Sequence, residues 1–334
     1  MNEVREPAAI AAPHGGLRAV LDALAARHAR GETPVLAVVT ACSGPTYRKP
    51  GALALFDETG LVAGALSGGC LEEELAIAAR EALATARAVA HGVDTGSADD
   101  LVFGTGSGCG GRMDVLLLPL LPQVPLAAAL HALRSGASPL AVTLHADGSG
   151  AAQLGEGETW QWPAPAGSAA SADASAPARL AITPPPRLLA LGAGPETPAL
   201  LQFLQRLGWY VEVQEHRARW ASYAAGADAL HAAPPGTLPE VAVHCRAAVV
   251  MTHQFEGDRA HLAALAATSM PYVGLLGPTA RRDALLAALG DAAAALRPRL
   301  HAPVGLRLGG EGPEAIALSI AAGLTAHLHG RDDG

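Results

Sequence analysis

The sequence has few aromatic residues, little positive charge and no long apolar run, and each shortage excludes a class of protein. Aromatic residues make up 4% of the 334 residues, so any large core must be built from alanine, leucine and valine. Lysine and arginine number 23 against 31 acids, the formal net charge is −8, and no basic run stands out. Nucleic acids and membrane surfaces attract clustered positive charge, so we expect neither as a partner.

Membrane-spanning segments and paired cysteines are also missing from the sequence. No apolar stretch approaches the roughly 18–20 residues that a membrane-spanning helix needs, and the first residues lack the pattern of a signal peptide. No CxxC pair occurs among the four cysteines, which are Cys42, Cys70, Cys109 and Cys245. Scattered cysteines of this kind do not suggest a zinc site and are normally reduced inside the cell, so we expect a cytoplasmic protein.

The composition predicts two domains joined by a linker. Half of the residues are hydrophobic, and the length suits two domains of about 100–200 residues each. The segment 163–186 consists mostly of alanine, serine and proline, which bury too little surface to offset the entropy lost on ordering. The expected boundaries are a first domain at 1–162, a linker at 163–186 and a second domain at 187–330.

Hydrophobic periodicity predicts the secondary structure of each domain. In the first domain, helices are expected at 16–31, 71–88 and 127–134, and strands at 34–40, 52–56, 61–66, 101–104, 112–119 and 139–144. In the second domain, strands at 187–191, 210–215, 247–252 and 272–276 alternate with helices at 198–208, 258–267, 279–289 and 313–327. The pattern predicts an α/β protein with a mixed α/β first domain and a Rossmann-like, doubly wound parallel sheet in the second.

The first strand of the second domain runs into Gly192-Ala-Gly194 and then into a helix. Glycines at such a turn let a phosphate approach backbone amides at the helix N-terminus. Glu215 closes the next strand, where a dinucleotide fold places an acid for the ribose hydroxyls. Thr197 occupies the third glycine position and Pro195 removes a backbone donor. A nucleotide site and a scaffold that has lost or changed its ligand therefore both stay open.

His253 ends a further strand of the second domain, at the sheet edge where open α/β sheets bind ligands. Its side chain could donate a hydrogen bond to an anionic ligand or be oriented by Asp258. A purely structural histidine is the alternative interpretation.

Three loops of the first domain combine glycines with reactive or charged side chains. In the loop 40–51, Arg48 could bind a phosphate or carboxylate and Ser43 could add a hydrogen bond, unless the arginine is simply solvated. Gly68 and Gly69 precede Cys70, whose thiol at a helix N-terminus would have its pKa lowered by the helix dipole.

The third loop, 104–111, has five glycines in eight positions. It presents Cys109 beside Gly110 and Gly111, whose backbone can approach a bulky anion closely. A buried cysteine that acts only as a small apolar side chain is the alternative for Cys70 and Cys109.

The ordered set of motifs resembles the XdhC/CoxI family. In the first domain the similar segments are 44–51, 68–72 and 109–111. In the second domain they are 191–194, Thr252-His253 with Asp258, 272–277, 303–306 and 313–320. Pro195, Thr197 and Pro278 depart from the family pattern, and these departures weaken the case for a nucleotide in the second domain.

The resemblance implies an assembly factor for molybdenum hydroxylases such as xanthine dehydrogenase, and not an enzyme. Members bind and protect the molybdenum cofactor (molybdopterin), cooperate with a cysteine desulfurase that supplies its sulfido ligand, and pass the cofactor to the large subunit of the molybdenum hydroxylase. Such a carrier is compatible with a homodimer. The resemblance makes Cys109 and Cys70 candidate contacts to molybdenum, with Arg48 and the glycine-rich amides as anchors for the cofactor phosphate.

Two other functions stay open at the level of the sequence. An NAD(P)-dependent oxidoreductase would use the second domain, with His253 as proton donor. A docking scaffold would join hydroxylase and desulfurase without holding the cofactor, and it should be insensitive to the loss of Cys109 or Arg48.

Overall fold

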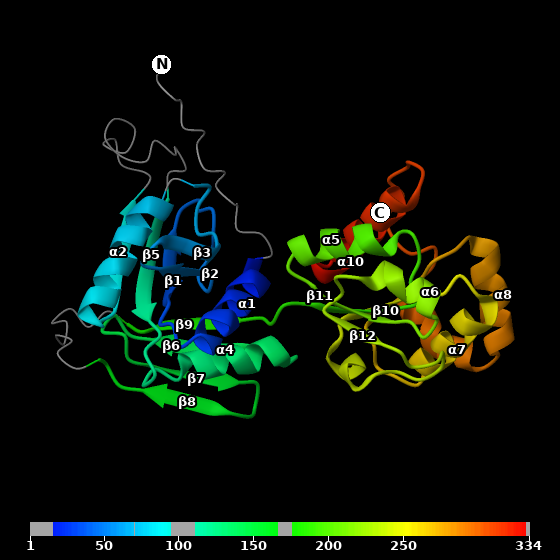
Figure 1. Ribbon diagram of the computed structural model, residues 1–334, viewed down its shortest axis with the longest axis horizontal. Helices are drawn as coiled ribbons and strands as arrows, with labels where there is room; N and C mark the ends of the chain where they lie inside the picture. The colour runs from blue at the N-terminus through cyan, green and yellow to red at the C-terminus, as the bar shows by residue number, and fades with distance from the viewer. Residues whose placement is uncertain (1–15, 70, 95–110, 166–175, 332–334) are drawn as a thin grey trace, which may run out of the picture. The chain divides into compact units, whose positions relative to one another are not determined.

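A computed structural model of the protein describes residues 16–69, 71–94, 111–165 and 176–331. The chain divides into two compact units, Met1–Pro184 and Pro185–Gly334 (Figure 1). The predictions for Cys70, Cys109 and Gly110, and for a strand at 101–104, lie outside the described residues.

The first unit contains a five-stranded antiparallel sheet in the order β3-β2-β1-β5-β4. Its strands are β1 (Val35–Ser43), β2 (Leu53–Asp57), β3 (Gly60–Gly64), β4 (Val89–Asp94) and β5 (Arg112–Pro119). Strand β1 begins with five consecutive buried residues, because side chains on both of its faces are covered. Helix α2 (Glu72–Thr85) packs on one face, and helices α1 (Gly16–Ala29) and α4 (Leu126–Ser135) contribute to the core on the other (Figure 1).

The strands expected at 52–56 and 61–66 are confirmed as β2 and β3, and they form a hairpin. Asp57 pairs with Gly60 in the strand register, and its Oδ1 accepts hydrogen bonds from the backbone amides of Thr59 at 2.7 Å and Gly60 at 3.2 Å. An aspartate at this position closes the turn with its own side chain, so the turn is specified by the local sequence.

A second, four-stranded antiparallel sheet has the order β8-β7-β6-β9. Its strands are β6 (Leu140–Leu144), β7 (Gly150–Leu154), β8 (Thr159–Trp162) and β9 (Ala178–Ile182). Strand β9 lies inside the segment expected to be a linker, so that expectation was wrong for 178–182. Leu180 and Ile182 alternate with exposed residues and are buried in the shared core, a period of two that the surrounding alanines and prolines obscured.

The second unit is a six-stranded parallel sheet in the order β12-β11-β10-β13-β14-β15. The strands are β10 (Arg187–Leu191), β11 (Tyr210–Gln214), β12 (Ala229–His231), β13 (Ala247–Val250), β14 (Tyr272–Leu275) and β15 (Leu300–His301). This is the doubly wound order of a Rossmann fold, so the predicted α/β class is confirmed for both parts of the chain.

Helices cover both faces of the parallel sheet (Figure 1). Helices α5 (Thr197–Arg206) and α10 (Pro313–Leu328) share one core with the strands, and α7 (Phe255–Ala266), α8 (Thr279–Leu289) and α9 (Ala292–Leu296) share the other. A short helix, α6 (Ala218–Ala221), follows β11. In the described part of the chain, no helix has the length and apolar character needed to cross a membrane.

Candidate functional site

The loop between β1 and β2 is held by its own arginine. The Nε of Arg48 donates to the carbonyl of Ala65 at 2.8 Å, which ties this loop to the segment after β3. Thr46 donates from its hydroxyl to the Arg48 carbonyl at 2.7 Å. Arg48 is half-buried, and a guanidinium has four further N–H donors beside the one on Nε. Arg48 is therefore an anchor of the loop that retains donors for a second partner.

The loop between β3 and α2 is organised by a serine and a glutamate. The hydroxyl of Ser67 donates to Glu72 Oε2 at 2.6 Å and accepts from the amides of Gly69 at 3.0 Å and Leu71 at 3.2 Å. Glu72 stands in the first turn of α2, where a carboxylate is favoured by the helix dipole. Gly68 and Gly69 are exposed, and nothing lies within 4 Å of a Cβ built on either one.

The end of the glycine-rich loop contacts the β1–β2 loop directly. Gly111 is buried, and a Cβ at this position would clash with the carbonyl of Pro45. The next residue, Arg112, pairs with Ser43 in the register between β5 and β1. The antiparallel order therefore brings Ser43, Arg48 and Gly111 to the same end of the five-stranded sheet.

A pocket of about 580 Å³ lies along β1, β4 and β5 and includes Arg112 from this end of the sheet. The side chains of Arg112 and Asp114 lie against Gly92, which has no side chain of its own. A Cβ built on Gly92 would lie 3.4 Å from both Arg112 Nη2 and Asp114 Oδ1. Arg112 and Asp114 form a surface ion pair at 3.2 Å, and their side chains are 59% and 44% exposed. The polar residues of the lining are Thr40, His91, Arg112, Asp114, His145 and Arg179. Sequence reasoning missed Arg112, although its place directly after the glycine-rich loop was a usable signal.

In the second unit, Gly192 and Gly194 stand at the carboxyl end of β10. A Cβ on Gly192 would lie 2.6 Å from the backbone of Thr252, and one on Gly194 would clash with the Nε2 of His253. Both glycines are therefore required by close packing against the end of β13, independently of any ligand.

Glu215 follows β11 and is buried, with 2% of its side chain exposed. Its carboxylate accepts hydrogen bonds from Arg217 Nε at 2.8 Å and Nη2 at 2.6 Å, and from the amide of Ala193 at 3.3 Å. Burial raises the pKa of the Glu215 carboxyl, but hydrogen bonds from the Arg217 side chain and backbone outweigh burial and leave the pKa below its usual range.

His253 pairs with Glu196 and not with Asp258. Its Nε2 lies 2.9 Å from Glu196 Oε1, and that hydrogen bond raises the pKa of the His253 imidazole above its usual value. The ring stacks on Trp220 with centroids 5.7 Å apart. Asp258 instead accepts from the hydroxyl of Thr252 at 2.6 Å and forms an ion pair with Arg281.

The backbone of His253 adopts a left-handed conformation, with φ of 58°. Residues other than glycine rarely adopt this conformation, and they do so where surrounding contacts impose it. The ion pair with Glu196 and the stack on Trp220 are contacts of this kind. Among the described residues, no group of three or more histidine, cysteine, aspartate or glutamate side chains could hold a metal ion.

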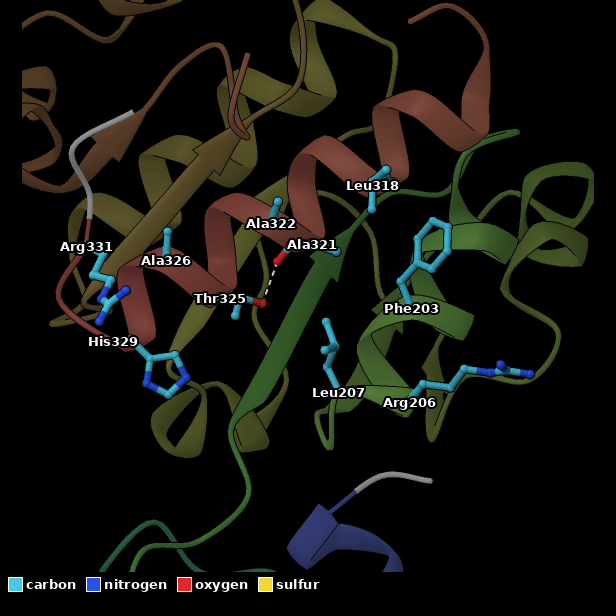
Figure 2. Close-up of a pocket in the computed structure, with 10 residues that line it drawn as sticks. All are labelled: Phe203, Arg206, Leu207, Leu318, Ala321, Ala322, Thr325, Ala326, His329 and Arg331. Carbon is cyan, nitrogen blue, oxygen red and sulfur yellow. Dashed lines mark hydrogen bonds between the residues drawn. The ribbon is translucent and has the colours of Figure 1, made fainter. Parts of the chain in front are cut away.

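A separate pocket of about 930 Å³ lies between α5 and α10 (Figure 2). Its floor is apolar, with Phe203, Leu207 and Leu318 among the side chains that face it. Arg206 stands at one end, and His329 and Arg331 stand at the other (Figure 2). None of the residues that the sequence identified as site candidates lines this pocket.

Comparison with known proteins agrees with this fold. Residues 188–324 match the model of the XdhC Rossmann domain, and residues 27–93 match that of the XdhC and CoxI family. A Bacillus subtilis (strain 168) protein, named as a probable subunit of xanthine dehydrogenase, is 32% identical over 328 residues, covering 92% of this chain and 96% of that protein. A crystal structure from Bacillus halodurans, described as a xanthine dehydrogenase, has a TM-score of 0.74 at 29% identity and covers 94% of this chain and 96% of its own. The chain therefore belongs to the XdhC and CoxI family.

Proposed function

We propose that this protein binds the molybdenum cofactor, protects it, and delivers it in sulfurated form to a hydroxylase of the xanthine dehydrogenase type. Association with such an enzyme is supported by the names of the relatives, which refer to xanthine dehydrogenase. The observation that carries the proposal is that Ser43, Arg48 and Gly111 meet at one end of the five-stranded sheet, where Arg112 belongs to a pocket that is also lined by Arg179.

The chemistry of these residues suits an anionic, phosphate-bearing ligand. Arg112 pairs with Asp114 on the surface, and an exposed pair contributes little to stability, so its guanidinium can exchange that partner for a phosphate at small cost. Arg48 retains donors beyond its bond to Ala65, and Ser43 stands opposite Arg112. These three side chains would hold the phosphate end of the cofactor.

The thiols of Cys70 and Cys109 would contact molybdenum or the sulfur that the desulfurase supplies. When bound, the cofactor supplies the molybdenum chemistry of the client enzyme, and the role of this chain is to hold and release it. The exposed backbone at Gly68 and Gly69 gives a bulky ligand access to the segment that precedes Cys70.

The decisive experiment is anaerobic binding of the purified protein to free molybdenum cofactor. Wild type should retain the cofactor, Cys109→Ala or Cys70→Ala should lose it, and Arg112→Ala should bind roughly 10–100-fold more weakly, as expected for one charged hydrogen bond. Arg246→Ala, which removes an exposed arginine of the second unit, is the matched control and should bind normally.

Delivery is tested separately by adding loaded protein to the cofactor-free large subunit of a hydroxylase and measuring its activity. Failure of wild type to retain cofactor would refute the proposal. If wild type retained no cofactor but still captured both hydroxylase and cysteine desulfurase, the protein would be a docking scaffold. If wild type retained no cofactor but bound NAD tightly, the protein would be an oxidoreductase.

A further inference from the structure

The turn after β10 is the place where a Rossmann fold normally binds a pyrophosphate through backbone amides. In this protein those amides already donate hydrogen bonds to side chains of the same domain. The amide of Ala193 donates to Glu215 Oε2 at 3.3 Å, and the amide of Gly194 donates to Thr197 Oγ1 at 2.8 Å. A phosphate that entered the turn would have to break both bonds.

Donors at the start of α5 are depleted as well. Pro195 and Pro198 have no N–H, and the amide of Thr197 donates to the carbonyl of Gly194 at 2.9 Å. The helix therefore begins with few of the free amides that make a helix N-terminus an anion site.

A carboxylate of the protein itself lies against the glycine turn. Glu196 stands immediately before α5, with 4% of its side chain exposed. A Cβ built on Gly194 would lie 2.7 Å from Glu196 Oε1, which places this carboxylate directly over the glycine turn. A second buried carboxylate, Glu215, reaches the same turn from the end of β11. Two carboxylates at one turn would repel a pyrophosphate.

The imidazole of His253 covers the carboxylate of Glu196. Its Nε2 bonds Glu196 at 2.9 Å, and its ring is held by the stack on Trp220. The guanidinium of Arg217 lies 5.0 Å from the centre of the Trp220 ring and donates to the carbonyl of Thr252 at 3.0 Å. The carboxyl ends of these strands are therefore covered by a continuous set of contacts among residues of the second unit.

We infer that the second domain does not bind a dinucleotide, because Glu196 lies against the glycine turn of the fold and His253 holds it there. The second domain thus has a Rossmann fold without the dinucleotide that this fold usually binds. This inference does not rest on the proposed function, because it concerns the second domain alone.

Isothermal titration of the full chain with NAD⁺, NADPH and inorganic pyrophosphate tests the inference. Wild type should bind none of the three. The double variant Glu196→Ala/Thr197→Ala removes the carboxylate and frees the Gly194 amide, so pyrophosphate should bind to it with an affinity at least about tenfold above the detection limit that wild type fails to reach. The control Glu256→Ala removes a glutamate that is 74% exposed on α7 and should behave as wild type.

Binding of NAD⁺, NADPH or pyrophosphate by wild type would overturn the inference. A correctly folded double variant that binds no pyrophosphate would also overturn the inference, because something other than Glu196 and Thr197 would then prevent phosphate binding. If the double variant does not fold, Glu196→Gln keeps the shape of the side chain without its charge. This variant should bind pyrophosphate more tightly than wild type and lower the pKa of His253 in an NMR titration, and the absence of both changes would refute the assignment.

Discussion

Replacement of Arg217 by alanine should destabilise the second domain strongly, because it leaves a buried carboxylate without its counter-charge. Arg217 donates to both oxygens of Glu215, at 2.8 Å and 2.6 Å, and to the carbonyl of Thr252 at 3.0 Å. Only 2% of the Glu215 side chain is exposed, so its carboxylate depends on partners within the protein for its hydrogen bonds. After the substitution, the backbone amides of Ala193 and residue 217 would remain as donors to the carboxylate.

The expected loss follows from the cost of breaking a buried ion pair by removing one partner, about 3–5 kcal/mol. For a unit of this size, each kcal/mol lowers Tm by about 2–4 °C, so Tm should fall by about 6–20 °C. Calorimetry of the full chain measures this in the transition of the second unit. Glu215→Gln combined with Arg217→Met removes both charges and should recover most of the lost stability.

The matched control is Arg259→Ala, which breaks an ion pair with Glu256 on the surface of α7. The side chains of that pair are 42% and 74% exposed, so its loss should cost less than about 1 kcal/mol. If Arg217→Ala cost no more than this control, Glu215 would not depend on Arg217, and the closure of the sheet edge by these contacts would be refuted.

Two further predictions concern other parts of the molecule. Burial lowers the pKa of His261 to about 4, so the folded protein holds this histidine neutral while the unfolded chain protonates near pH 6.5. Stability should therefore fall as pH decreases from about 6.5 to about 4, by about 3 kcal/mol in total. His261→Phe should lose this part of the pH dependence in urea unfolding, and an unchanged slope would contradict the assignment. Separately, Gly111→Ala should destabilise the first unit by about 1–3 kcal/mol, because its Cβ would clash with the carbonyl of Pro45. Gly68→Ala, where nothing lies within 4 Å, should have little effect, and equal losses in the two variants would contradict this packing.

Much of the fold could be predicted because the signals were local. The apolar runs of β1 and β10, the aspartate turn of the β2–β3 hairpin and the periodicity of α5 and α10 all lie within short stretches of sequence. Strands β7 and β12 gave no such signal, since Gly150–Leu154 and Ala229–His231 carry few large apolar side chains. They are strands because a neighbouring strand supplies the hydrogen bonds, and pairing of that kind depends on the tertiary structure.

The candidate site was predictable only in part. Arg48, Ser43 and Gly111 could be selected from loop composition, but their meeting at one end of the sheet depends on the β1–β5 register. Arg112 was missed: its place directly after the glycine-rich loop was a signal, but its pairing with Ser43 depends on the strand register.

The sequence by itself determined the α/β class, the family and the residues of the glycine turn, because periodicity and motif order are properties of the chain alone. Only the tertiary structure decided what that turn does. It directs Glu215 toward the amide of Ala193 and Thr197 toward the amide of Gly194, so that side chains of the protein accept from the donors that a phosphate would have used, and it pairs Glu196 with His253 beside them. Contacts between side chains far apart in sequence are set by packing, and no local pattern encodes them.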